Sequence, residues 1–153
     1  MLEPLFQSFM MAGVECSTHR LRSGKRLDLI AATQHDRFAT QDYARFLNAG
    51  FKTIRSGLRW HLIETRPGHY DFSSARAQVR AAREMGLQVI WDICHYGYPD
   101  DLDIFQAAFV DRFAAYARAA VQFLSQETDG PLFVCPINEI SFFSWGGRRG
   151  GLP

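Results

Sequence analysis

Short apolar runs alternate with longer amphipathic stretches along this chain. The apolar runs, at residues 9–14, 51–55, 87–94 and 132–137, have the length and composition of β-strands. The last run is opened by a Gly-Pro pair and is apolar throughout, which is typical of a parallel strand covered on both faces. The pattern therefore predicts four strands of a buried parallel sheet.

Helical periodicity fills the stretches between the strands. The expected helices cover residues 40–50, 74–85 and 101–127. Thr40 is the expected cap of the first helix, and Asp71 or Ser73 that of the second. Gly50 and Gly86 stand where these two helices should end, because glycine readily adopts the left-handed conformation that closes a helix. An aromatic stripe along the third helix is expected to be core.

The alternation of strands and helices predicts an α/β fold with right-handed crossovers. Arg55, His95 and Glu139 end the last three strands and lie roughly 40 residues apart, comparable with the strand-helix units of a (β/α)8 barrel that carries insertions. About four such units make the N-terminal half of a TIM barrel, as a single domain over residues 1–153. Its first and fourth strands would have open edges, so we expect a C-terminal half-barrel or self-association to cover them.

Composition and charge limit the classes of molecule that this chain is expected to bind. The chain has 153 residues, 47% of them hydrophobic, and a formal net charge of +1. This balance gives no electrostatic reason to expect nucleic acid or a membrane surface as a partner. The N-terminus lacks a basic region and a run of about 18 apolar residues, so neither an export signal nor a membrane span is expected. The expected partner is a neutral molecule.

The cysteines Cys16, Cys94 and Cys135 lie in apolar, strand-like segments without a close-spaced pair. Reduced thiols in a cytoplasmic protein are therefore expected. The alternative is a zinc site that joins them to histidines of other strands, which no Cys-x-x-Cys or His-x-x-x-His spacing supports. Buried structural cysteines are favoured, and neither a metal nor a cofactor is expected.

Polar residues of specific kinds follow three of the strands: Arg55, His95 and the pair Asn138-Glu139. The carboxyl ends of parallel strands meet at one edge of a sheet, so these side chains are expected to face one site. Arg, His and Asn offer fixed donors and acceptors to sugar hydroxyls, and a Glu in a partly apolar pocket can donate a proton at neutral pH. Taken singly, Arg55 could pair with a carboxylate of the sheet, His95 could be a core histidine and Glu139 could be a solvated carboxylate. Taken together, they favour a carbohydrate site.

The side-chain alternation of strands predicts which residues accompany them inside the barrel. The expected inward-facing residues are Thr53 and Arg55 of one strand, Val89, Trp91, Ile93 and His95 of the next, and Cys135, Ile137 and Glu139 of the last.

Longer segments carry a resemblance to a known family. Residues 41–55 followed by Trp60, the segment CHYGYP at 94–99 and the pair Asn138-Glu139 resemble segments of clan A glycoside hydrolases, most closely the N-terminal half of the family 1 β-glycosidases. The resemblance covers nearly everything from residue 35 onward.

Three positions depart from the family pattern. Tyr96 and Gly97 stand where the family usually has Trp-Asp after the histidine, and Ile140 stands where Pro commonly follows Asn-Glu. The sugar-binding Gln of the family's first strand has no clear counterpart among residues 13–19.

The resemblance implies β-glucosidase-like hydrolysis by a retaining double displacement. Glu139 would be the general acid/base, Asn138 would hold the sugar 2-hydroxyl, Arg55 would orient the nucleophilic carboxylate and His95 would bind a glycone hydroxyl. The family's nucleophile is a Glu on the seventh strand, which this sequence does not reach, so the chain alone is expected to be inactive. A non-catalytic carbohydrate-binding or interaction module, or two copies closing one barrel, are the alternatives.

Overall fold

A computed structural model describes residues 4–147 and contains one four-stranded parallel sheet. Its strands are β1 (Ala12–Gly13), β2 (Thr53–Gly57), β5 (Gln88–Cys94) and β6 (Phe133–Ile137). They lie in the order β1-β2-β5-β6, which is also their order along the chain. The predicted α/β class is therefore confirmed, and within the described residues β1 and β6 form the two edges of the sheet.

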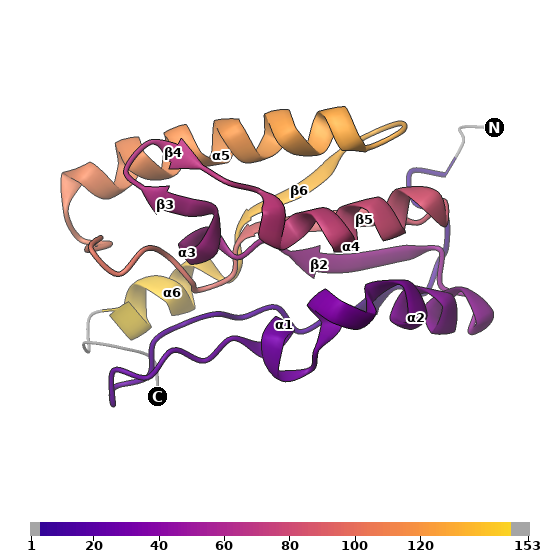
Figure 1. Ribbon diagram of the computed structural model, residues 1–153, viewed down its shortest axis with the longest axis horizontal. Helices are drawn as coiled ribbons and strands as arrows, with labels where there is room; N and C mark the ends of the chain where they lie inside the picture. The colour runs from indigo at the N-terminus through magenta and orange to yellow at the C-terminus, as the bar shows by residue number, and fades with distance from the viewer. Residues whose placement is uncertain (1–3, 148–153) are drawn as a thin grey trace.

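Three long helices lie side by side against the sheet (Figure 1). They are α2 (His35–Asn48), α4 (Ser73–Glu84) and α5 (Ala107–Glu127). The sequence pattern did not predict three short helices and a hairpin. The helices α1 (Leu29–Ala32) and α3 (Trp60–Ile63) and the hairpin of β3 (Glu64–Arg66) and β4 (His69–Tyr70) lie in the connections, and α6 (Ile140–Gly147) follows β6. In the described residues, no helix combines the length and apolar character needed to cross a lipid bilayer.

The helix ends correct part of the sequence interpretation. Thr40 is not a cap, because α2 begins at His35, five residues earlier, and Gln34 in a left-handed conformation precedes it. The Asp71 side chain does act near the start of α4, where its Oδ1 accepts a hydrogen bond from the Ser73 N–H at 2.8 Å. Helix α5 begins at Ala107 rather than at residue 101. Gly50 adopts φ +88° just after α2, as expected, and Gly86 likewise follows α4 with φ +66°.

The first strand is shorter than expected. Residues 9–11 lie outside β1, which covers only Ala12–Gly13. The reason lies at Ser8, whose Oγ accepts hydrogen bonds from the N–H groups of Lys52 and Thr53, both at 3.0 Å. At this end of the sheet, the Ser8 side chain thus replaces the backbone hydrogen bonds that would otherwise extend β1 along β2.

The inward and outward faces of β5 are the reverse of the prediction. Val89 and Trp91 line a cavity of about 220 Å³ together with Val79 and Ala82 of α4, so they face the helices. The even-numbered side chains of β5 face the opposite side. The alternation could not be read from the sequence because β5 is buried on both faces, which makes it almost uniformly apolar.

The N-terminal segment closes the amino end of the inner face of the sheet. The Gln7 N–H donates to Thr53 Oγ1 at 3.0 Å, and Thr53 Oγ1 donates to Gln88 Oε1 at 2.7 Å. The rings of Phe6 and Phe133 lie 5.2 Å apart. These contacts leave the carboxyl end of the same face as the place for a site.

Candidate functional site

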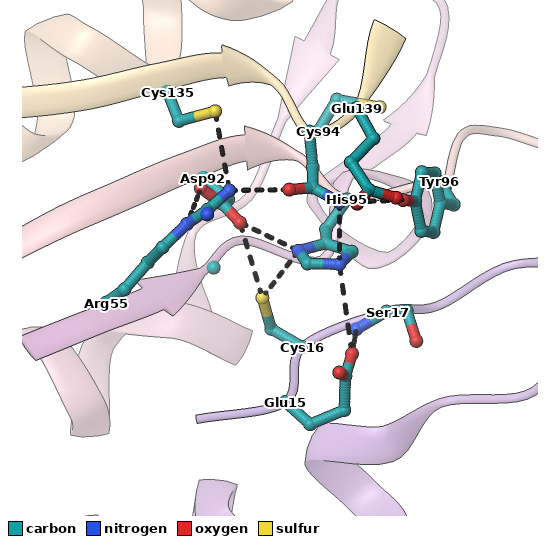
Figure 2. Close-up of polar contacts among 12 residues, drawn as sticks. Glu15, Cys16, Ser17, Arg55, Asp92, Cys94, His95, Tyr96, Cys135 and Glu139 are labelled. Carbon is teal, nitrogen blue, oxygen red and sulfur yellow. Dashed lines mark hydrogen bonds and ion pairs between the residues drawn. The ribbon is translucent and has the colours of Figure 1, made fainter. Parts of the chain in front are cut away.

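The structure brings together Arg55, His95 and Asn138 at the carboxyl end of the sheet. Figure 2 shows the side chains of Arg55 and His95 pointing toward each other. Arg55 lies on β2, His95 follows β5 and Asn138 follows β6. Arg55 Nη2 donates to Asn138 Oδ1 at 2.6 Å, and Asn138 Nδ2 lies 3.1 Å from His95 Nε2. Side chains roughly 40 residues apart in sequence thus form one hydrogen-bonded group, as the sequence analysis expected.

Asp92 is the centre of this network, and the sequence analysis missed it. Its carboxylate is fully buried, with Oδ1 accepting from Arg55 Nε at 2.8 Å and Oδ2 lying 2.7 Å from His95 Nδ1. The missed signal was an aspartate inside an apolar strand, since a buried carboxylate must be paired.

Burial and the partners of Asp92 act on its pKa in opposite directions. Burial alone would raise its pKa, but the hydrogen bonds from His95 and Arg55 outweigh burial and hold the pKa below its ordinary value. Asp92 is therefore ionised at neutral pH. Because its carboxylate accepts the Nδ1 proton of His95, Nε2 of the same ring is left as an acceptor for the Asn138 amide.

His95 reaches this group through a local change of backbone. The strand β5 ends at Cys94, and the next residues leave the regular alternation, with Tyr96 at φ +65°. The ring of His95 then lies edge-on to that of Tyr96, with centroids 4.9 Å apart. The side chain of His95 faces the site, as predicted. It does so because of the turn after β5, and not because of the side-chain alternation along the strand on which the prediction was based.

Glu139 lies next to the network but outside its buried part. Its side chain is exposed, and its Oε2 accepts a hydrogen bond from the hydroxyl of Tyr96. The same hydroxyl accepts from Asn138 Nδ2 at 2.8 Å. Burial, and then the Glu139 carboxylate, raise the pKa of Tyr96, so the phenol keeps its proton and remains a donor. Glu139 itself has φ +42°, a conformation that non-glycine residues rarely adopt.

Two glycines make room for the site. A Cβ on Gly57 would lie 2.6 Å from Cys16 Sγ, and a Cβ on Gly97 would lie 1.8 Å from Thr18 Oγ1. These contacts bring the segment that follows β1 close to β2 and to the turn after β5. The departure from the family pattern at Gly97 therefore has a steric reason in this chain.

Glu15 is a second carboxylate at the mouth of the site. Its Oε1 accepts from the Ser17 N–H at 2.9 Å and lies 3.8 Å from His95 Nε2, and its side chain is 55% exposed. Burial raises the pKa of Glu15, whereas the hydrogen bonds from Ser17 and the nearby His95 lower it. The lowering effects together are larger, so the net change of the pKa is downward. The sequence analysis left this segment without a role.

Comparisons with known proteins show a likeness of fold. No family model matches the chain, and no curated protein matches it. Among solved structures, it is similar to the exo-beta-1,4-mannosidase Op5Man5 from Opitutaceae bacterium strain TAV5, with a TM-score of 0.53 and 24% sequence identity. The match covers 76% of this chain but only 22% of that one. The fold is that of part of a TIM barrel, in agreement with the predicted half-barrel.

Proposed function

We propose that this chain carries the acid/base side of the active site of a retaining β-glycosidase, with Glu139 as the general acid/base. The observation that carries the proposal is the arrangement around Asn138, whose amide is held by Arg55 and Tyr96 immediately before the exposed carboxylate of Glu139. The fixed amide can bind a sugar hydroxyl. The solvent-accessible carboxylate next to it can then protonate the departing glycosidic oxygen of the same sugar.

The other side chains have roles that follow from their contacts. Asn138 would bind the sugar 2-hydroxyl, and His95, whose Nδ1 lies 2.7 Å from Asp92 Oδ2, would offer Nε2 to a second hydroxyl. Arg55 would present its guanidinium to the nucleophilic carboxylate, because it is 43% exposed although anchored to Asp92. Asp92 would act as a positioning residue, since it is buried beneath the reacting groups.

The nucleophile of this reaction would come from a C-terminal half-barrel. A retaining mechanism needs two carboxyl groups about 5 to 5.5 Å apart. Asp92 is unsuited, because its carboxylate is fully buried and paired with Arg55. We therefore expect the chain to be inactive alone and to gain activity when a clan A half-barrel with a seventh-strand Glu is supplied.

Co-expression with such a half-barrel tests the proposal. Hydrolysis of aryl β-glycosides should appear, and Glu139→Gln should lower kcat/KM by about 100-fold or more. Azide, which attacks a glycosyl-enzyme without needing a general base, should restore turnover of activated aryl glycosides by Glu139→Gln. The matched control is Glu84→Gln at the exposed end of α4, which should change nothing. A gain in hydrolysis that is insensitive to Glu139→Gln would reject the assignment.

The sugar and the family are finer proposals. The sequence segments favour family 1 and β-glucosides, whereas the named activity of the structural neighbour puts β-mannosides in the same assay panel. We propose β-glucosides as the better substrates. A consistently higher kcat/KM for β-mannosides would count against the family 1 assignment without affecting the role of Glu139.

A non-catalytic sugar-binding module is the second candidate. The hydrogen bond from Tyr96 to Glu139 favours it, because it occupies the carboxylate that would otherwise serve as the general acid/base. Titration calorimetry of the chain with glucosides and a gluconolactam would separate the two functions. Binding that Asn138→Ala abolishes, with no turnover in any half-barrel complex, would support the module; absence of heat at millimolar ligand would remove it.

A further inference from the structure

Three metal-ligating side chains meet beside the hydrogen-bonded group of Arg55, His95 and Asn138. Cys16 Sγ lies 3.1 Å from His95 Nδ1 and 3.8 Å from Asp92 Oδ2, and the last two atoms are 2.7 Å apart. Cys16 and Asp92 are buried, and His95 is 14% exposed. They come from two segments that are distant in sequence: Cys16 follows β1, whereas Asp92 and His95 lie three residues apart at the end of β5. We propose that Cys16, Asp92 and His95 form a binding site for a thiophilic divalent cation such as Zn²⁺.

The ligand set selects the ion. A thiolate, an imidazole nitrogen and one carboxylate oxygen suit Zn²⁺ and exclude the oxygen-preferring Mg²⁺ and Ca²⁺. Tetrahedral zinc would require separations of about 3.3 to 3.6 Å between these atoms. The sulfur–oxygen distance of 3.8 Å would have to shorten by about 0.2 Å to enter this range. An outward shift of the imidazole by about 0.5 Å would lengthen the distances from His95 Nδ1 to the sulfur and to the carboxylate oxygen. Water would take the fourth position.

Glu15 provides the partner that a metal-bound histidine needs. When Nδ1 of His95 binds the cation, its proton moves to Nε2, and the Cys16 thiol releases its own proton to solvent. Glu15 Oε1 lies 3.8 Å from Nε2, and its exposed side chain would accept the new N–H after moving closer by about 0.8 Å. Carboxylates in this position orient metal-bound imidazoles and strengthen them as ligands.

The charges of the site also balance. Asp92, Glu15 and the Cys16 thiolate carry three negative charges, which offset a divalent cation together with the positive charge of Arg55. Arg55 binds the other oxygen of Asp92, at 2.8 Å from Nε, so Oδ2 is the oxygen that faces Cys16 and His95. The cation would therefore not have to displace the guanidinium.

Metal binding would oppose the binding of a sugar. In the metal-free arrangement His95 Nε2 accepts from Asn138 Nδ2, at 3.1 Å. Once Nε2 carries a proton it can no longer accept, so Asn138 loses one of the contacts that hold its amide. The metal site is argued from its own ligands and does not rest on the proposed glycosidase activity.

The test measures metal directly on the full chain, reduced with a non-thiol reductant. Co²⁺ should give a near-ultraviolet thiolate-to-cobalt charge-transfer band, and Zn²⁺ should bind one to one in competition with a chromophoric chelator. Cys16→Ser should abolish the band and weaken Zn²⁺ binding at least tenfold, and Glu15→Gln should weaken it by about tenfold. Circular dichroism of each variant checks the fold, and Cys16→Ala serves if the serine variant is unstable.

Cys135→Ser is the matched control. Its sulfur lies 3.5 Å from Nη2 of Arg55, whose Nε binds Asp92, but it is not one of the three proposed ligands. The control should keep both the cobalt band and the Zn²⁺ affinity. A wild-type cobalt spectrum without a thiolate band, or a loss of Zn²⁺ affinity as large in Cys135→Ser as in Cys16→Ser, would overturn the proposal.

Discussion

Arg55 reaches across β5 and donates from Nη2 to Asn138 Oδ1 at 2.6 Å, joining two strands that are not neighbours in the sheet. Its Nε binds Asp92 of the intervening strand at the same time. The planar guanidinium can hold both acceptors in a fixed relation, which a single ammonium cannot do. The geometry of the site therefore depends on arginine itself and not only on a positive charge.

Replacing Arg55 by Lys should accordingly lower the free energy of unfolding by about 1 to 2 kcal/mol, because one of two charge-assisted hydrogen bonds is lost. Urea denaturation at neutral pH measures this change. Arg45→Lys is the control, since Arg45 is largely exposed and forms only a surface ion pair with Asp42. Equal stability of the Arg55 and Arg45 variants would show that the guanidinium fork is not needed.

Asp92 should make stability depend on pH. Its folded pKa lies below the ordinary value of about 3.9, so its contribution is complete above that pH and is lost as the pH falls through the folded pKa. Asp92→Asn should cost about 2 to 3 kcal/mol at pH 7 and flatten the decline in stability below pH 4. Urea denaturation between pH 3 and pH 7, with exposed Asp129→Asn as the control, tests both effects. A variant with an unchanged acid profile would contradict the argument.

Gly97 should tolerate no side chain. Gly97→Ala would place a methyl group 1.8 Å from Thr18 Oγ1 and 2.7 Å from the Thr18 carbonyl oxygen, so backbone must move. We expect a loss of about 1 to 3 kcal/mol in thermal or urea unfolding. Gly13→Ala is the control, because its nearest neighbour is the Arg55 carbonyl oxygen at 4.0 Å. Similar stabilities for the two alanine variants would mean that the segment around Thr18 yields easily.

The thiols of Cys94 and Cys135 should differ in reactivity. Cys94 is fully buried, and burial raises its pKa to about 12, whereas Cys135 is only partly buried. A disulfide reagent should therefore label Cys135 first in the native protein and reach Cys94 only on unfolding. Mass spectrometry of tryptic peptides after short exposure measures the order. Labelling of Cys94 at the rate of Cys135 would indicate frequent opening of the region between β5 and α5.

The fold was predictable from the sequence where the pattern was strong. Four strand segments, the three long helices between them and the terminating glycines at 50 and 86 follow directly from apolar runs and helical spacing. The hairpin β3-β4 was not predicted, because its strands are two and three residues long and carry mostly polar side chains. Local patterning is weak evidence for elements that depend on tertiary contacts.

The site was predictable only in part, for a related reason. Arg55, His95 and Asn138 were recognisable as polar residues at strand ends, and the structure brings them together. Asp92 was missed because β5 is covered on both faces, so its inward-facing side could not be assigned from alternation, although an aspartate inside an apolar strand was itself a signal of a paired carboxylate. Cys16 was hidden because its neighbours at the site, Asp92 and His95, are more than 70 residues away and share no spacing with it.

The left-handed backbone at Tyr96 and Glu139 has a consequence for how this protein can be improved. Each such residue costs of order 1 kcal/mol or more that a glycine would avoid. Directed evolution that rewards only heat resistance should therefore select replacements at these two positions early, and the resulting robust variants should be the ones that have lost any carbohydrate chemistry.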